Sequence, residues 1–297
     1  MVAAWLAAGG VLYGVKLRRS AVTVSARAEA FDADLVRLRG RTPLVLVPVA
    51  NPTRAVPLMQ IADALAAPGV GRILALTVVP YDPEDFRASS LESWERTESA
   101  LRKTVEAAGE LGRPFEAVVR LVSDVTEAIV STAAERKPEA IVLGMSRMEK
   151  GGPKILERVI ARTNADVVVL NSPPDWSLDR VRRVIVPVAG ETPHSALRAR
   201  ILGLLRKKGE PTGHLLRILR PGQDRDRARR HLEMDADDLG LPEGHIIIEE
   251  SVNPVEAIVR HSKQADLIVL GLGQRGGRTR LIGDFALAVV GGAHCPV

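Results

Sequence analysis

Leu44-Val-Leu-Val-Pro-Val-Ala50 decides the fold, because a β-branched apolar run of this length is typical of a strand buried on both faces. Asn51-Pro-Thr53 interrupts the run with residues that favour turns. The next stretch, 54–67, predicts a helix, and Pro68-Gly69 ends it. A buried strand followed directly by a helix is the start of a β-α-β unit.

The alternation of strand and helix continues to residue 170. The expected strands are 73–79, 115–122, 140–144 and 166–170, and the expected helices are 90–111 and 123–136, with a loop and a short helix before the last strand. Strands separated by helices are parallel and joined by right-handed crossovers. The sequence therefore predicts an open parallel five-stranded sheet.

The pattern then begins again, and three tetrapeptides recur in the same order. Val-Pro-Val-Ala occurs at 47–50 and 186–189, Glu-Ala-Ile-Val at 127–130 and 256–259, and Ile-Val-Leu-Gly at 141–144 and 268–271. Matched segments in one order indicate an internal duplication. The second copy is expected to have strands at 184–189, 215–219, 246–249 and 267–271, and helices at 195–207, 224–239 and 255–263.

Ser172-Pro-Pro-Asp175 separates the two copies, which predicts a first domain at 42–172 and a second at 180–297. The expected fold class is α/β, with two tandem open parallel five-stranded sheets flanked by helices. In such sheets, ligands bind beyond the carboxyl ends of the strands, where the strand order reverses. The candidate sites therefore follow Ala50, Gly144, Ala189 and Gly271.

Composition narrows the classes of partner. Apolar residues make up 46% of the 297, enough for two cores, whereas aromatic residues make up 3%, too few for a surface that stacks unpaired bases. The net charge of +5 is compatible with an anionic partner such as a nucleotide phosphate or an acidic lipid, and also with an ordinary solvated surface. A single cysteine, Cys295, excludes an intrachain disulfide.

The N-terminal segment is unusual. Val2–Val15 is almost continuously apolar, and Lys16, Arg18 and Arg19 follow it. The run is shorter than the about 20 residues that span a bilayer, and a secretory signal would carry its positive charges before the apolar run. We interpret 1–20 as the end of a transmembrane helix or a membrane anchor with its basic flank on the cytoplasmic side. A frayed amphipathic leader is the alternative.

No catalytic motif is present: the sequence has no Gly-x-Ser-x-Gly elbow, no phosphate-binding Walker loop and no His-Glu-x-x-His. The six histidines are dispersed, and the adjacent pair His294-Cys295 is too small for a metal site. Basic and acidic residues alternate along 224–238, which is typical of a solvated face and not of a DNA-binding helix. We therefore expect no enzyme activity, no metal and no nucleic-acid partner.

Glycines after the fourth strand of the second copy carry the strongest chemical hint. Gly271 and Gly273 lead into a loop that contains Arg275 and Arg278 and ends at Gly283. Glycines let a backbone approach a phosphate, and the N–H groups of a following helix hold the anion. An exposed loop in which glycine serves only backbone geometry is the alternative.

The two halves together resemble the universal stress protein family. Its nucleotide-binding members share Gly-x2-Gly-x9-Gly-Ser/Thr after the fourth strand and an Asp at the end of the first strand. In this sequence Gly273-x9-Gly283 keeps the second spacing, Gly271 stands one residue too close, and Asp284 replaces Ser or Thr.

The first half departs further from that pattern. Gly144 matches the first glycine, Arg147 replaces the second, and Glu157-Arg158 stand where Gly-Ser is expected. Ala50 and Ala189 occupy the acidic position of the first strand. The resemblance thus implies a nucleotide site that is degraded in both halves. Its candidate residues are Ala50, Asn51, Gly144, Ala189, Gly190, Gly271, Gly273, Arg275, Arg278, Gly283 and Asp284.

A second resemblance covers residues 1–52. An apolar segment, a basic stop and the strand Leu46-Val-Pro-Val-Ala-Asn-Pro52 look like the junction between the last membrane helix and the cytoplasmic universal stress protein domains of amino-acid permease-type transporters. This resemblance implies a regulatory or sensing module at the cytoplasmic face of the membrane, with a transporter membrane domain or the membrane surface as its partner. No cofactor is required, and ATP or another adenine nucleotide binds weakly at most. An ATP-binding universal stress protein with slow ATPase activity, and a pure scaffold, are the alternatives.

The family resemblance also implies the arrangement of strands. We expect the order 3-2-1-4-5 in each sheet, with the two fifth strands meeting between the halves as in an intrachain pseudo-dimer; a homodimer of whole chains is a further expectation. Since the chain stops at Val297, the fifth strand of the second half should be brief or frayed.

Overall fold

The computed structural model describes most of the chain beyond residue 42. The described residues are 43–67, 70–80, 89–145, 152–188, 212–238, 241, 245–271 and 283–297. The expected membrane segment 1–20 and the expected helix 195–207 lie outside them. Within the described ranges, no helix is both long enough and apolar enough to cross a bilayer.

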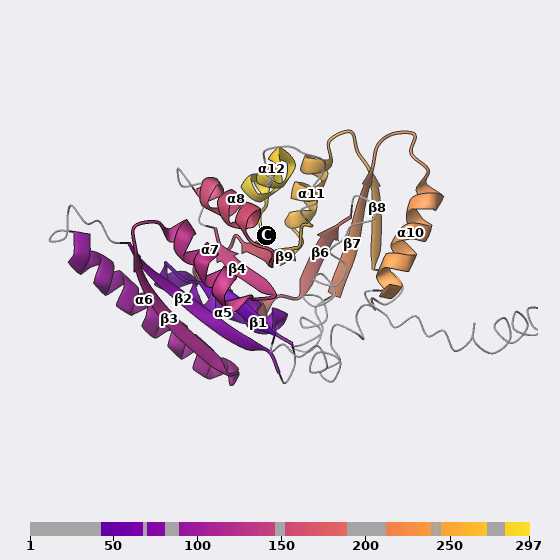
Figure 1. The fold of residues 1–297 in the computed structure, drawn as a ribbon. Coiled ribbons are helices and arrows are strands. Elements are labelled where there is room, and N and C mark those ends of the chain that lie inside the picture. The colour runs from indigo at the N-terminus through magenta and orange to yellow at the C-terminus, as the bar shows by residue number, and fades with distance from the viewer. Residues whose placement is uncertain are drawn as a thin grey trace, which may run out of the picture.

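The first half folds as a parallel sheet in the predicted order, β3-β2-β1-β4-β5 (Figure 1). Its elements are β1 (Leu44–Pro48), the short 3-10 helix η2 (Pro52–Arg54), α5 (Ala55–Leu65), β2 (Arg72–Pro80), α6 (Ser89–Leu111), β3 (Phe115–Val122), α7 (Val125–Arg136), β4 (Ala140–Gly144), α8 (Gly152–Arg162) and β5 (Asp166–Leu170). Leu46 pairs with Leu74 on one side and with Ile141 on the other, which places β1 at the centre.

Alternate residues of β1 serve two cores. Val45 and Val47 are buried with side chains of α5 and α6, whereas Leu46 is buried with side chains of α7 and α8. Successive residues of a strand point to opposite faces, so a continuously apolar strand needs helices on both sides. This arrangement fixes the carboxyl end of β1 between helices of both layers.

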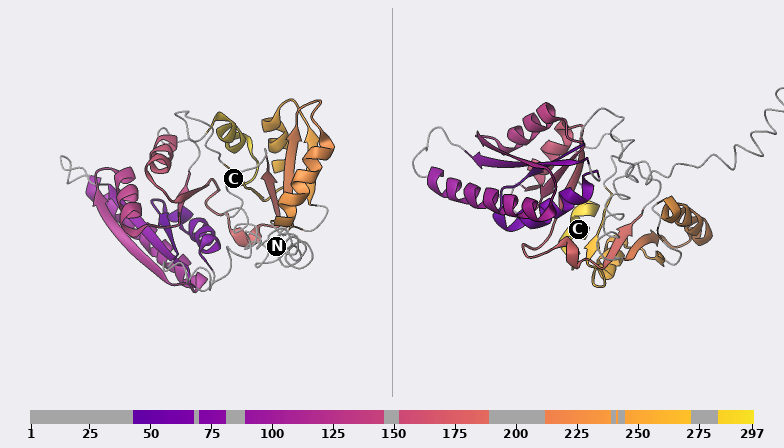
Figure 2. Two further views of the ribbon diagram at one scale, coloured as in Figure 1. Left: turned by 45° about the vertical axis from the view of Figure 1, so that its right-hand side comes forward. Right: turned by 90° about the horizontal axis from the view of Figure 1, so that it is seen from below.

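The second half repeats the order as β8-β7-β6-β9. Its elements are β6 (Arg183–Pro187), β7 (Thr212–Leu219), α10 (Arg225–Asp238), β8 (Ile246–Glu250), α11 (Pro254–Ser262), β9 (Leu267–Ile268) and α12 (Asp284–Gly292). Val186 and Ile185 are buried in different clusters, as the alternation in β1 would lead one to expect. The sheets stand beside each other with the C-terminus between them (Figure 2).

The second sheet has four strands among the described residues, where five were expected. The last residues lie beside β9, and the Ile268 N–H donates to the Pro296 carbonyl at 2.9 Å. Pro296 itself has no N–H to donate, so a regular ladder cannot form there. Val297 and Asn171 exchange two backbone hydrogen bonds of 2.8 and 3.0 Å, which joins the segment after β5 to the end of the chain.

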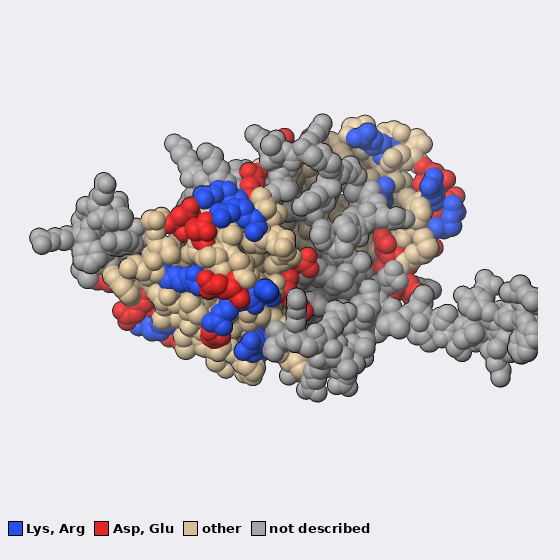
Figure 3. Space-filling view, in the orientation of Figure 1, with Lys and Arg blue, Asp and Glu red and all other residues tan. Residues whose placement is uncertain are grey.

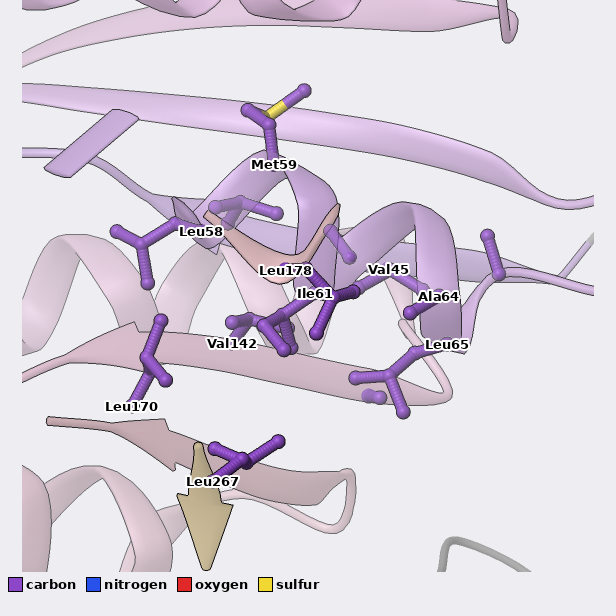
Figure 4. Close-up of a cluster of buried hydrophobic side chains, with 14 of the residues drawn as sticks. Val45, Leu58, Met59, Ile61, Ala64, Leu65, Val142, Leu170, Leu178 and Leu267 are labelled. Atoms are coloured by element: carbon purple, nitrogen blue, oxygen red, sulfur yellow. The ribbon is translucent and has the colours of Figure 1, made fainter. Parts of the chain in front are cut away.

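The halves also share apolar core. Figure 4 shows side chains of α5 beside Leu170 of β5, Leu178 of the short helix η3 (Leu178–Arg180) and Leu267 of β9. These three leucines are 3–4% exposed and belong to one buried cluster with α5. The linker is therefore part of the packed interior where it crosses between the sheets.

Candidate functional site

A cavity of about 760 Å³ opens at the carboxyl ends of β1, β2 and β4. Its lining includes three predicted site residues, Ala50, Asn51 and Gly144. The central strand β1 lies between β2 and β4, so its end is where the order of strands reverses in the first sheet. The fold thus brings together residues that lie more than 90 positions apart in the sequence.

Asn51 has a local structural role. Its side-chain oxygen accepts from the Thr53 N–H at 3.0 Å and from the Thr53 hydroxyl at 2.8 Å, which caps η2. Such a turn is a common function of Asn after a strand. Ala50 is exposed beside it and carries no polar group toward the cavity.

Gly144 is needed for close packing. A Cβ atom added there would lie 3.3 Å from Leu58 Cδ1 and 3.8 Å from Arg54 Cδ. The absence of a side chain lets α5 approach the end of β4. Close packing against α5 therefore favours glycine at this position, whether or not a phosphate ever approaches it.

Arg54 is a site residue that the sequence analysis missed. Its Nη1 donates to the Met145 carbonyl at 2.6 Å, across the end of β4. Arg54 is also the N-cap of α5 and makes no side-chain capping bond there. A cation at a helix N-terminus is electrostatically unfavourable, and this was the signal that could have suggested another role for the residue.

The cavity wall is mainly apolar. Buried side chains from β2, β4, α5, α7 and α8 form it, among them Leu58, Leu76, Ile129, Leu143 and Leu156. Among the described lining residues, the charged groups are the guanidinium groups of Arg54 and Arg96, and there is no carboxylate.

The expected Gly-Ser position of the first half falls inside a helix. Glu157 and Arg158 lie more than a turn beyond the start of α8, where no bare backbone loop can form. Arg158 instead donates to Asp124 at 2.7 Å, and this hydrogen bond together with backbone N–H donors lowers the pKa of the Asp124 carboxyl. Asp124 also caps α7.

In the second half, the structure describes three of the predicted residues. Gly271 follows β9 and is exposed, Gly283 is the N-cap of α12, and Asp284 is the first residue of that helix. Ala189, Gly190, Gly273, Arg275 and Arg278 lie outside the described residues. Arg217, which the sequence analysis did not single out, donates to the Val188 carbonyl at 3.0 Å near the end of β6.

The described residues hold no group of three His, Cys, Asp or Glu side chains that could bind a metal ion. His294 instead lies 3.3 Å from the Ser262 hydroxyl through Nδ1. Burial raises the pKa of the Cys295 thiol to about 11, so the thiol is protonated at neutral pH. A protonated, partly buried thiol is a poor metal ligand and a poor nucleophile.

Solved structures share this arrangement at low sequence identity. A universal stress protein from Archaeoglobus fulgidus DSM 4304 aligns over 86% of this chain and 95% of its own, with 20% identity and a TM-score of 0.59. A putative universal stress protein from Pseudomonas aeruginosa UCBPP-PA14 covers 86% and 91%, with 16% identity and a TM-score of 0.57. The cytoplasmic domain of a prokaryotic cation chloride cotransporter covers 86% and 94%, with 14% identity and a TM-score of 0.56.

No curated protein matches the sequence significantly. The universal stress protein family matches residues 44–173 and 217–297, one segment in each half and well over half of the chain in total. The strand order of both sheets agrees with the order that the resemblance implied. The chain therefore belongs to the universal stress protein family, as a tandem of two such domains.

Proposed function

We propose that this tandem is a non-enzymatic regulatory or sensing module, the cytoplasmic part of an amino-acid permease-type transporter, with a degraded nucleotide site. The observation that carries the proposal is the cavity at the end of β1. Ala50 stands at the position where nucleotide-binding members have Asp, and the described wall contains no carboxylate to replace it. Losing a hydrogen bond to a charged group costs about 1.5–3 kcal/mol, or roughly 10- to 100-fold in affinity.

The same cavity supports the non-enzymatic part of the proposal. Its described lining has no Ser, Cys, His, Asp or Glu, the side chains that most often act as nucleophiles or general bases. Among the described lining residues, only Asn51 and two arginines are polar. Such a wall can bind a ligand and is poorly suited to activating water.

A transporter context is supported by the fold and by the N-terminal sequence. A cytoplasmic domain of a cotransporter shares the tandem fold over 86% of this chain. The apolar run Val2–Val15 with its basic flank supports a membrane attachment at the cytoplasmic face. Basic and acidic residues are interspersed on the described part of the face shown in Figure 3, which supports the expectation of no nucleic-acid partner, since such a partner would need an unopposed basic patch.

Titration calorimetry of the full chain with ATP tests the degraded site. We expect binding weaker than about 100 μM, and Ala50→Asp should tighten it by about tenfold or more by restoring a charged acceptor. Ala189→Asp is the matched substitution in the second half. Micromolar binding by the wild-type chain, or steady release of phosphate, would instead support the alternative of an ATP-binding stress protein, which the position of the cavity favours.

A second experiment tests the membrane attachment. The full chain and a chain lacking residues 1–19 are floated with vesicles of phosphatidylglycerol and phosphatidylethanolamine. We expect the full chain to float with the vesicles and the shortened chain to remain at the bottom of the gradient. Equal behaviour of the two chains would contradict the membrane reading of the N-terminal segment.

A further inference from the structure

The cavity of the first half has an apolar wall, and the loss of nucleotide-binding residues does not by itself explain why the wall is apolar. Its floor is formed by Leu76 and Leu143, which are 0% and 4% exposed, and by Leu58 of α5. A volume of about 760 Å³ lies within the range of roughly 300–1,000 Å³ found for small-molecule sites. The described wall of this cavity is mainly apolar.

Its outer side differs from its floor. Ile155 is 39% exposed and lines the cavity from α8. Arg96 of α6 is exposed and lines the same cavity. The wall therefore changes from aliphatic at the floor to cationic at the exposed side.

Arg54 gives a second positive charge in a fixed place. Its bond to the Met145 carbonyl holds the guanidinium at the end of β4, and its stem runs past Gly144. An arginine side chain remains charged at every physiological pH. The two arginines thus stand on different elements around an apolar hollow.

We propose that this cavity binds an amphiphilic anion, a small molecule with an apolar chain or ring and one anionic end such as a carboxylate. The apolar part lies against Leu76 and Leu143, and the anionic end lies toward Arg54 and Arg96. Such a ligand matches both parts of the wall, whereas a nucleotide carries a polar ribose and several charges. This ligand would be the signal that the module senses, and in that respect the inference rests on the proposed function.

The test uses the full chain with 1-anilinonaphthalene-8-sulfonate as fluorescent probe and decanoate, decanol and ATP as competitors. We expect saturable binding of the probe, displacement by decanoate at lower concentration than by decanol, and no displacement by ATP. Equal potency of decanoate and decanol would overturn the role of the arginines. Failure of decanoate to displace the probe would overturn the inference as a whole.

Two substitutions locate the site. Val78→Trp should fill the cavity and weaken decanoate binding at least tenfold. Ile218→Trp is the matched control, because Pro48 pairs with Leu76 and Pro187 with Leu216, so Val78 and Ile218 hold the same place in the two sheets. Equal weakening by both substitutions would overturn the assignment to the first half.

Milder variants keep the test decisive if the tryptophan prevents folding. Ile155→Glu changes a partly exposed position and should weaken decanoate at least tenfold, and decanol less. Arg96→Gln should weaken decanoate severalfold and leave decanol unchanged; unchanged decanoate in both variants would overturn the inference. Displacement of the probe by ATP would overturn both this inference and the proposal of a degraded nucleotide site. If no competitor displaces the probe, this inference is overturned, but the proposal of a degraded nucleotide site is not.

Discussion

The helices that follow the third and fourth strands are joined differently in the two halves. In the first half, Arg158 and Arg162 of α8 form ion pairs of 2.7 and 2.8 Å with Asp124 and Glu127 at the start of α7. In the second half, α12 contains no basic residue, and Gly292 packs directly against Val259 of α11. Duplication conserved the backbone arrangement while the side-chain contacts that hold it diverged.

The amino-terminal edges of the sheets show the same divergence. By strand register, Leu44 and Leu74 of the first sheet correspond to Arg183 and His214 of the second. Leu74 is fully buried, whereas His214 stacks on His245 with ring centroids 5.0 Å apart. At this edge the first half therefore has the aliphatic side chains of Leu44 and Leu74, whereas the second half has the cationic Arg183 and the titratable His214.

The largest loss of stability is expected for a side chain that forms hydrogen bonds with the linker between the two halves. Gln60 of the first half is buried, donates to Ser177 and Asp179 at 3.0 Å each, and accepts from the Leu178 N–H at 2.8 Å. Gln60→Ala should lower the free energy of unfolding by about 2–3 kcal/mol, chiefly because the buried Leu178 N–H loses its acceptor. Urea unfolding followed by circular dichroism measures the change.

Asp266 of the second half also forms hydrogen bonds with the linker, and it can be compared with Gln60 because it is exposed. Its carboxylate accepts from the N–H groups of Arg182 and Arg183 at 2.8 Å each, but Asp266 is exposed. Water can replace that carboxylate, so Asp266→Ala should cost about 1 kcal/mol. An Asp266 variant as unstable as the Gln60 variant would show that burial does not decide the difference.

The next effect concerns packing between α11 and α12. A Cβ atom on Gly292 would lie 2.9 Å from Val259 Cγ2, whereas one on Gly291 would meet nothing within 4 Å. Gly292→Ala should be less stable than Gly291→Ala by about 2 kcal/mol, because overpacking opposes the gain in helix propensity. Equal unfolding midpoints for the two variants would show that the helices separate without cost.

A pH-dependent effect from a histidine is expected in the second half. Burial first, and then the charges of Arg183 and His245, lower the pKa of His214 below its ordinary value near 6.5. The unfolded chain therefore binds the proton more readily, so stability is complete above about pH 6.5 and falls on acidification toward the lower folded-state pKa. One proton gives at most about 1.4 kcal/mol per pH unit, and less here because the ring is partly exposed.

His214→Leu copies the first half at Leu74 and should remove this dependence. Unfolding midpoints of the variant and the wild type, compared at pH 5, 6 and 7.5, should differ most at pH 5. His231→Gln on α10 changes an exposed histidine and serves as control. A difference that grows with rising pH would contradict the assignment.

The smallest effect is expected for the ion pairs of the first half. Arg158 and Asp124 are both substantially exposed, and exposed pairs contribute little to stability. Arg158→Ala should lower the melting midpoint slightly in dilute buffer, and the difference should vanish in 1 M NaCl because of screening. A change as large as that of Gly292→Ala would show that the first half depends on its ion pairs.

Much of the fold could be predicted because the signals are local. The bounds predicted for β3, β4 and β5 agree with the structure, since β4 and β5 are short apolar runs between turn residues and β3 is rich in Phe, Val and Leu. The second sheet has four strands among the described residues, where a brief or frayed fifth was expected, and Pro296 lacks an N–H for the ladder there. The predicted role of Ala50, Asn51 and Gly144 in nucleotide contact stays a prediction.

By itself, the sequence determined the duplication, the parallel direction of the strands and the edge of the first sheet where the cavity lies, because apolar periodicity and repeated tetrapeptides are properties of the chain read in order. Only the tertiary structure decided what that site contains. Arg54 contacts Met145 across 91 positions, and Gln60 contacts the linker across 117 to 119. Contacts between such distant segments depend on how the helices settle on the sheet, and no local pattern encodes that packing.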